Sequence, residues 1–223
     1  MANKAKDYSQ NGEEGFLIEY FALNRPKSQQ NPQTRYYVEI GAYDGENYSN
    51  TKMLQGIGWH GVLIEPNPTL FNRLLANRAD DVTGCYEVAC VSSSDIEYVD
   101  FTIFDEVPYM SGIAPIPDKV KPEHRALHRP YSERIERVKA MTLNKVLESY
   151  FEGEPHPIDF ISLDTEGTEK QVLKGLDFDV WQPRLLCIEN NDPRNEDLTA
   201  RMADRGYVVA TVIGINTFYE RVK

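Results

Sequence analysis

Short apolar runs alternate with helix-length segments along most of this sequence of 223 residues. The runs are rich in β-branched and aromatic residues, and they occur at 35–41, 61–65, 85–91, 158–163, 184–189, 207–212 and 215–221. Most are separated by segments with apolar residues at spacings of three and four, as in amphipathic helices. Strands joined by helices form right-handed βαβ units. The pattern therefore predicts an α/β fold with a mostly parallel sheet and helices on both faces.

The punctuation between the runs refines this prediction. Asn67 before Pro68 predicts a helix start, and Thr168 with Gln171 predicts a capping box at another. Only a short glycine-containing link separates 207–212 from 215–221, which predicts a hairpin. We therefore expect one antiparallel strand at the edge of the sheet.

The segment 95–141 does not follow the alternation. It reads as a strand, then a proline-bearing irregular stretch, then a second strand or a helix start. A loop of this length in a compact domain is usually functional or disordered. We expect one domain over residues 1–223, in which 1–34 form an N-terminal helical segment and 95–141 an insertion that faces the substrate. Within the insertion, 109–112 are candidate acceptor contacts, and His124 with His128 fit a solvated loop better than a zinc site.

Composition excludes several classes of function. The chain has 24 Lys and Arg against 35 Asp and Glu, a formal charge of −11, whereas nucleic-acid binders carry a basic stripe. No apolar run has the length of a membrane span, and the first fifteen residues lack the apolar segment of a signal peptide. The three cysteines, Cys85, Cys90 and Cys187, lie in apolar contexts and predict buried, reduced thiols. We expect a cytoplasmic protein with no nucleic-acid or membrane partner; no oligomeric state is indicated.

The stretch YYVEIGAYDGENYSNT ends a predicted strand in a glycine-containing turn. In an open parallel sheet, ligands bind beyond the carboxyl ends of the strands. Gly41 and Gly45 would let the backbone approach a ligand, but Tyr43 takes the place of the middle glycine of the dinucleotide fingerprint. The carboxylates of Glu39 and Asp44 would repel a pyrophosphate and suit a ligand with an amino group or a sulfonium.

Glu65 ends the next predicted strand, where an acid can accept hydrogen bonds from both hydroxyls of a ribose. A ribose combined with a cationic group indicates S-adenosylmethionine rather than a nicotinamide cofactor. Two alternatives stay open. An NAD(P)-dependent reductase or epimerase is disfavoured by Tyr43, by the flanking acids and by the lack of an evident Tyr-x-x-x-Lys pair. A non-catalytic cofactor-binding module would share the same fold and pocket.

These motifs resemble those of the FkbM-type S-adenosylmethionine-dependent methyltransferases. The resemblance covers nearly the whole chain and rests, in order, on VEIGAYDGENYSNT, GWHGVLIEPNP, EVACVSSSD, MTLNKVL, FISLDTEGTEKQVLKG and LLCIEN. It implies a Rossmann-like class I methyltransferase fold of seven strands with the last antiparallel. It also implies methyl transfer, most often to a hydroxyl oxygen, here of a small metabolite or sugar. Members of that family often have a longer N-terminal region, which we do not expect here. The cofactor contacts that it implies are Gln10, Glu39, Gly41, Asp44, Gly45, Glu65, Pro66 and Asn67, with Ala89 and Cys90 near the adenine.

A second acidic group follows the strand predicted at 158–163. Asp164 ends that strand, Glu166 follows two residues later, and Glu189 ends the next strand. A hydroxyl acceptor must lose a proton. A carboxylate can accept it as a general base, or a divalent metal held by carboxylates can make the hydroxyl more acidic. We predict Asp164 and Glu166 as catalytic residues and expect no metal, although the carboxylates would suit Mg²⁺ or Ca²⁺. Alternatively, Asp164 binds the amino group of the cofactor, Glu166 caps turn amides, and Glu169 stabilises a helix start.

Overall fold

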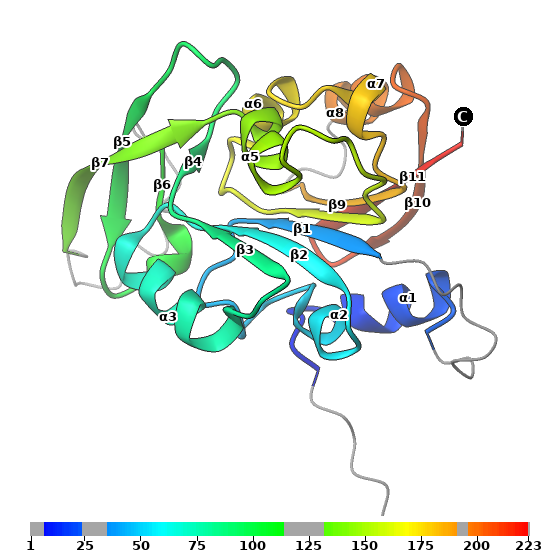
Figure 1. Ribbon diagram of the computed structural model, residues 1–223, viewed down its shortest axis with the longest axis horizontal. Coiled ribbons are helices and arrows are strands. Elements are labelled where there is room, and N and C mark those ends of the chain that lie inside the picture. The colour runs from blue at the N-terminus through cyan, green and yellow to red at the C-terminus, as the bar shows by residue number, and fades with distance from the viewer. Residues whose placement is uncertain (1–6, 24–34, 114–131, 191–195, 223) are drawn as a thin grey trace, which may run out of the picture.

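A seven-stranded sheet in the order β10-β11-β9-β8-β1-β2-β3 forms the centre of the molecule (Figure 1). The computed structural model describes residues 7–23, 35–113, 132–190 and 196–222. Neighbouring strands from β9 to β3 run parallel, as the alternating sequence predicts. The strands of this sheet are β1 (Tyr36–Ile40), β2 (His60–Ile64), β3 (Thr83–Tyr86), β8 (Phe160–Leu163), β9 (Leu185–Glu189), β10 (Tyr207–Ile213) and β11 (Asn216–Arg221).

The predicted hairpin is confirmed, but its second strand does not lie at the edge. β11 lies between β9 and β10 and pairs antiparallel with both, so β10 is the edge strand. The reason is burial on two faces. Phe218 and Tyr219 are both fully buried and belong to the hydrophobic clusters on opposite sides of the sheet. β10 instead exposes Val208, Val209 and Val212 by 44%, 43% and 49%.

Helices cover both faces of the sheet (Figure 1). On one face, Leu17 and Leu54 of the helices pack against Tyr37 and Phe160 of the strands. On the other, Leu147, Val172 and Met202 pack against the opposite sides of the same strands. Helices α1 (Glu13–Tyr20), α2 (Lys52–Gly56) and α3 (Pro68–Arg78) supply the first layer, and α5 (Leu143–Tyr150), α6 (Glu169–Lys174), α7 (Phe178–Trp181) and α8 (Glu196–Ala203) the second.

The single strand predicted at 85–91 is wrong, because the segment divides between two sheets. Tyr86 pairs with Ile64, the last residue of β2, and there the main sheet ends. The next strand, β4 (Ala89–Cys90), pairs instead with β7 in a second sheet of order β4-β7-β5-β6. The apolar run is therefore continuous in sequence, but its first part pairs with β2 and its second part pairs with β7.

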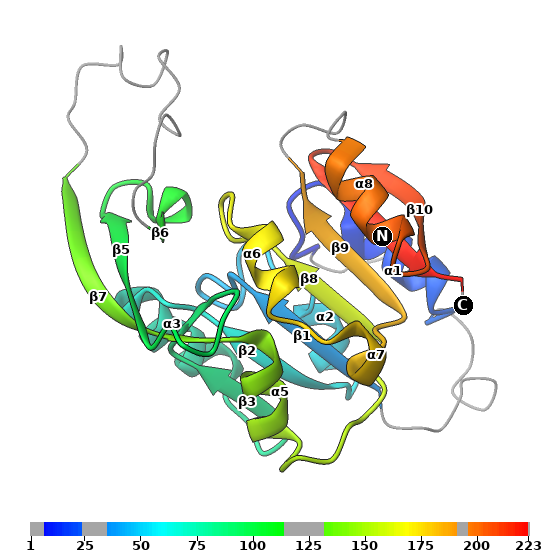
Figure 2. The same ribbon diagram turned by 90° about the horizontal axis from the view of Figure 1, so that it is seen from above.

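The insertion builds most of this second sheet, which stands to one side of the main sheet (Figure 2). Its stretch IERVKAM is part of a strand and not a helix start. Residues 114–131, with His124 and His128, lie outside the described residues. The described elements are β5 (Tyr98–Phe104), the 3₁₀ turn η2 (Pro108–Met110), β6 (Gly112–Ile113) and β7 (Glu133–Met141).

Two expectations from composition concern these elements. None of the described helices is long and apolar enough to cross a membrane. All three cysteines are unpaired, and Cys90 and Cys187 are buried as predicted, but Cys85 is partly exposed. Cys85 lies on β3, the outermost strand of the sheet at that end.

The pairing of β1 with β2 gives a test of the core. Gly61 lies opposite Tyr37, and a Cβ atom at position 61 would lie 2.0 Å from the Tyr37 ring. Because that ring is fully buried, we expect Gly61→Ala to lower the free energy of unfolding by about 1–3 kcal/mol. Gly15→Ala in α1 is the matched control, because no atom lies within 4 Å of its Cβ position, and it should raise stability by up to about 1 kcal/mol. Urea denaturation measures both changes, and equal effects would contradict the packing described here.

Candidate active site

A cavity of about 760 Å³ lies at the carboxyl ends of the parallel strands. The ends of β1, β2, β8 and β9 form one side, and Phe101, Tyr109, Met110 and Ser111 of the insertion form part of the other. Its volume is typical of sites for small molecules and cofactors. Of the residues predicted from sequence, Gln10, Glu39, Gly41, Glu65, Pro66, Ala89, Cys90, Asp164 and Glu166 line it, whereas Asp44, Gly45 and Asn67 do not.

Glu39 is buried, and its carboxylate is occupied by the protein itself. It accepts hydrogen bonds from Ser49 Oγ at 2.9 Å, from the backbone N–H of Asn50 at 2.9 Å and from Thr51 Oγ1 at 2.7 Å. The guanidinium of Arg78 lies 3.6 Å away. Glu39 therefore stabilises the turn that follows β1, and the guanidinium of Arg78 balances its negative charge.

The sequence analysis missed Arg78, a residue that organises this site. Its side chain is completely buried at the end of α3 and donates five hydrogen bonds. A signal was present, since Leu70, Leu74 and Arg78 recur every four residues on one face of that helix and all are buried. The acceptors are Gln55 Oε1 (2.6 Å), Gly45 O (2.9 Å), Ser49 Oγ (3.0 Å), Tyr37 O–H (3.0 Å) and Thr51 Oγ1 (2.9 Å).

Asp44 and the two glycines of the turn also serve the protein's own packing. The Asp44 carboxylate accepts hydrogen bonds from the backbone N–H groups of Glu46 at 3.0 Å and Asn47 at 2.8 Å. A Cβ atom on Gly45 would lie 2.5 Å from Arg78 Cγ, and one on Gly41 would lie 1.7 Å from the carbonyl oxygen of Asp164. Cofactor contact by these three residues stays a prediction.

Glu65 is held with its carboxylate at the cavity wall. Its Oε2 accepts the backbone N–H of Tyr43 at 2.9 Å, and its Oε1 accepts that of Asn67 at 2.8 Å. Burial raises the pKa of this carboxyl to about 7. Tyr43 adopts φ +54, a left-handed backbone conformation that costs a residue with a side chain about 1 kcal/mol or more. Each Glu65 oxygen keeps capacity for a further donor from a ligand.

Asn67 caps α3, which confirms the predicted helix start. Its side chain is used for this cap, and the residue does not line the cavity. Its Oδ1 accepts the backbone N–H groups of Thr69 at 3.0 Å and Leu70 at 3.5 Å, at the first turn of α3. Pro66 keeps its place in the lining.

Gln10 lines the cavity because a buried acid ties down the N-terminal segment. Glu13 is fully buried and accepts the backbone N–H of Asn11 at 2.7 Å and Nδ2 of Asn216 at 2.7 Å. This links the segment before α1 to the start of β11. The sequence analysis predicted a helical segment here but missed the role of Glu13.

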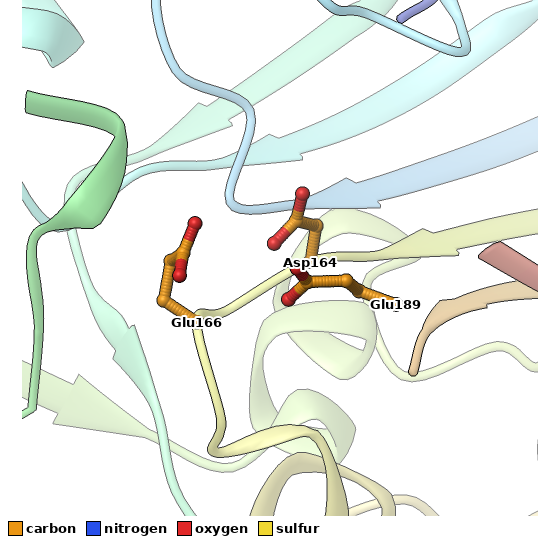
Figure 3. Close-up of side chains that lie close together, drawn as sticks. All are labelled: Asp164, Glu166 and Glu189. Atoms are coloured by element: carbon orange, nitrogen blue, oxygen red, sulfur yellow. The ribbon is translucent and has the colours of Figure 1, made fainter. Parts of the chain in front are cut away.

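The carboxylates of Asp164, Glu166 and Glu189 converge at the ends of β8 and β9 (Figure 3). One oxygen of each lies within 4.8 Å of the others. Burial, followed by the nearby negative charges of Glu189 and Glu166, raises the pKa of the Asp164 carboxyl well above its usual range. Asp164 Oδ1 is closed off from solvent and accepts no hydrogen bond from the described part of the chain.

The capping box predicted from Thr168 and Gln171 is wrong. Thr168 makes no side-chain cap, and Glu169 takes over the turn before α6. Glu169 Oε1 accepts the backbone N–H of Thr165 at 3.1 Å and that of Gly167 at 2.7 Å. Glu169 thus has the turn-capping role that the sequence left open for Glu166.

A sequence profile of the methyltransferase FkbM domain matches residues 39–209, most of the chain. This protein belongs to the FkbM methyltransferase family. The match spans the strand ends at Glu39, Glu65, Asp164 and Glu189, that is, the wall of the cavity just described. It confirms the resemblance and favours methyl transfer over the nicotinamide-dependent alternative.

Individual proteins are also similar to this chain. The methyltransferase sdnD of Sordaria araneosa is 26% identical over 202 residues, covering 79% of this chain and 74% of that protein. Among solved structures, the METTL16 MTase domain has 13% identity and a TM-score of 0.47 over 96% of this chain and 68% of that one. The O-methyltransferase from Bacillus cereus in complex with SAH has 14% identity and a TM-score of 0.42 over 96% and 92%. The fold assignment rests on the strand order of this chain and on the family match.

The network around Arg78 yields a stability prediction. Removing the guanidinium by Arg78→Met would leave Glu39 buried without its partner, which typically costs about 3–5 kcal/mol. Arg73→Met, an exposed change on the same helix, should alter stability by no more than about 0.5 kcal/mol. Denaturant unfolding curves compare the two variants with the wild type. A loss below about 1 kcal/mol for Arg78→Met would contradict the central role of this network.

Proposed function

We propose that this FkbM-family protein transfers a methyl group from S-adenosylmethionine to a hydroxyl oxygen of a small molecule such as a sugar or a hydroxylated metabolite. The observation that carries the proposal is the buried carboxylate of Glu65. Two backbone N–H groups fix it at the end of β2, and its remaining acceptor capacity faces a cavity of about 760 Å³. That arrangement suits the paired hydroxyls of a ribose.

The charge of the cavity supports a cationic donor and disfavours phosphate. From the sequence we expected Glu39 and Asp44 to attract a cation. In the structure, however, Arg78 balances the charge of Glu39, and Asp44 caps its own turn. The acids that converge in the cavity are instead Asp164, Glu166 and Glu189, at and just after the ends of β8 and β9. Acids beside the strand ends would repel the backbone of a nucleic acid, which supports a small acceptor.

The chemistry that we infer is an in-line displacement. The acceptor oxygen forms a bond to the methyl carbon while the bond between that carbon and sulfur breaks. The electron pair of the broken bond stays on sulfur, which leaves S-adenosylhomocysteine. The hydroxyl proton passes to a carboxylate at the cavity wall, for which Asp164 and Glu166 are the candidates. Positioning of the two reactants supplies much of the acceleration in such a reaction.

Cofactor affinity should depend on pH through Glu65. Ribose hydroxyls donate to the ionised carboxylate, so binding of S-adenosylhomocysteine should weaken as the pH falls below about 7, the pKa of this group. Glu65→Gln should weaken binding roughly tenfold or more, because the amide offers a single acceptor oxygen, and should abolish that pH dependence, because the amide does not titrate. Isothermal titration calorimetry from pH 5.5 to 8.5 measures both, with the exposed Glu87→Gln as control. Tighter binding of NADH than of S-adenosylhomocysteine would overturn the proposal.

Turnover should depend on Asp164. We expect Asp164→Asn to keep affinity for S-adenosylhomocysteine within about tenfold while removing methyl transfer, since the amide no longer accepts the proton. The assay follows release of S-adenosylhomocysteine with a panel of hydroxylated acceptors. Loss of cofactor binding in this variant would reassign Asp164 as a ligand of the cofactor's amino group. Cofactor binding with no turnover on any acceptor would favour a non-catalytic module.

A further inference from the structure

The acidic wall of the cavity brings together side chains from two separate strands. Leu163 of β8 pairs with Ile188 of β9, so the residues that follow, Asp164 and Glu189, lie side by side at the ends of the two strands. Glu166 adds a third carboxylate from the loop after β8, in a left-handed backbone conformation with φ +56. Figure 3 shows the three carboxylates gathered around a common space. One oxygen of each lies within 4.8 Å of the others.

Asp164 Oδ1 is a buried acceptor atom that has no donor among the described residues. The same is true of Asn50 Oδ1, on a side chain that is only 8% exposed and that lines the same cavity. Asn50 donates its Nδ2 to Ser162 Oγ at 3.0 Å, and Ser162 lies two residues before Asp164 on the same face of β8. A buried acceptor without a donor costs about 1–3 kcal/mol, so these oxygens indicate a missing positive or donating group.

We propose that Asp164, Glu166 and Glu189 bind one divalent cation of the oxygen-preferring class, Mg²⁺, Mn²⁺ or Ca²⁺. Three carboxylate oxygens, with the buried Oδ1 of Asp164 among the available ligands, form a site without histidine or cysteine, which disfavours zinc and copper. Cation binding needs no cofactor, so it is independent of the proposed function. Only the role of the ion rests on that function.

The spacing of the oxygens fits such an ion. Oxygens on opposite sides of Ca²⁺ lie about 4.6–5.2 Å apart, and those around Mg²⁺ at most about 4.2 Å apart. The observed limit of 4.8 Å accommodates Ca²⁺ as it stands and Mg²⁺ after a small rotation of a side chain. Glu166 is partly exposed and lies on a loop, so a rotation of its side chain would make that adjustment.

The site lies where the acceptor would meet the methyl donor. If the proposed function holds, the cation would orient the acceptor hydroxyl and lower its pKa, and Asp164 and Glu166 would serve mainly as ligands. Bond making and breaking at the methyl carbon would proceed as described above, but the proton would pass to solvent or to a carboxylate that does not bind the ion.

The test is cation binding to the cofactor-free protein at pH 7.5. We expect Mn²⁺ to bind one ion per chain, measured by loss of the free Mn²⁺ signal in electron paramagnetic resonance. Tb³⁺ should bind in competition with it, with luminescence sensitised by Tyr43, Tyr48 and Tyr109 of the cavity lining. Glu166→Gln and Glu189→Gln should each weaken binding by at least about tenfold. The exposed Glu148→Gln should bind as the wild type does.

Distinct outcomes would overturn the proposal. No Mn²⁺ binding at millimolar concentration, or equal binding by wild type and Glu166→Gln, would refute the site. Loss of S-adenosylhomocysteine affinity in both variants without Mn²⁺ binding to any protein would assign the acids to the cofactor's ammonium group. Glu166→Gln changes a partly exposed loop residue, so its unfolding curve should match the wild type and separate loss of the site from loss of the fold. A protein that binds Mn²⁺ but not S-adenosylhomocysteine would keep the cation site and refute the methyl donor.

Discussion

The buried pairing of Arg78 with Glu39 is the interaction on which the site depends. Two charges taken out of water are costly unless hydrogen bonds satisfy them, and here the guanidinium uses five donors while the carboxylate has three further hydrogen-bond donors. The network joins β1, the turn after it and α3 into one unit. Arg78 holds the carbonyl of Gly45 in the same turn from which the N–H of Tyr43 reaches Glu65. The buried pair thus supports the carboxylate that we propose binds the cofactor.

This pairing also decides where negative charge remains available to a ligand. Glu39 lines the cavity but is balanced, whereas Asp164 is surrounded by other acids and its pKa is strongly raised. Proximity to the cavity is therefore a poor guide to which acid attracts a cation. Burial of each charge with or without a counter-charge is the better guide.

Much of the fold was predictable from the sequence, because strand and helix periodicities are local. The parallel sheet, the hairpin and the cap of α3 by Asn67 all follow from residues close together in the chain. The position of β11 and the division of 85–91 between two sheets depend on pairing partners far away in sequence, which local patterns do not encode. The same holds for the site. Glu65, Asp164 and Glu189 follow from their places at strand ends, but Arg78 takes on its role only when distant segments meet.

The order of the strands explains how Glu65 and the acidic wall are kept apart along one edge of the sheet. β1 lies between β2, which carries Glu65, and β8, which carries Asp164. At the end of β1 stands Gly41, where a Cβ atom would lie 1.7 Å from the Asp164 carbonyl oxygen. The close approach of the two strands therefore demands glycine, and position 41 places no side chain between Glu65, the proposed ribose-binding acid, and the acidic wall. This feature of the cavity thus follows from packing of the sheet, before any ligand is considered.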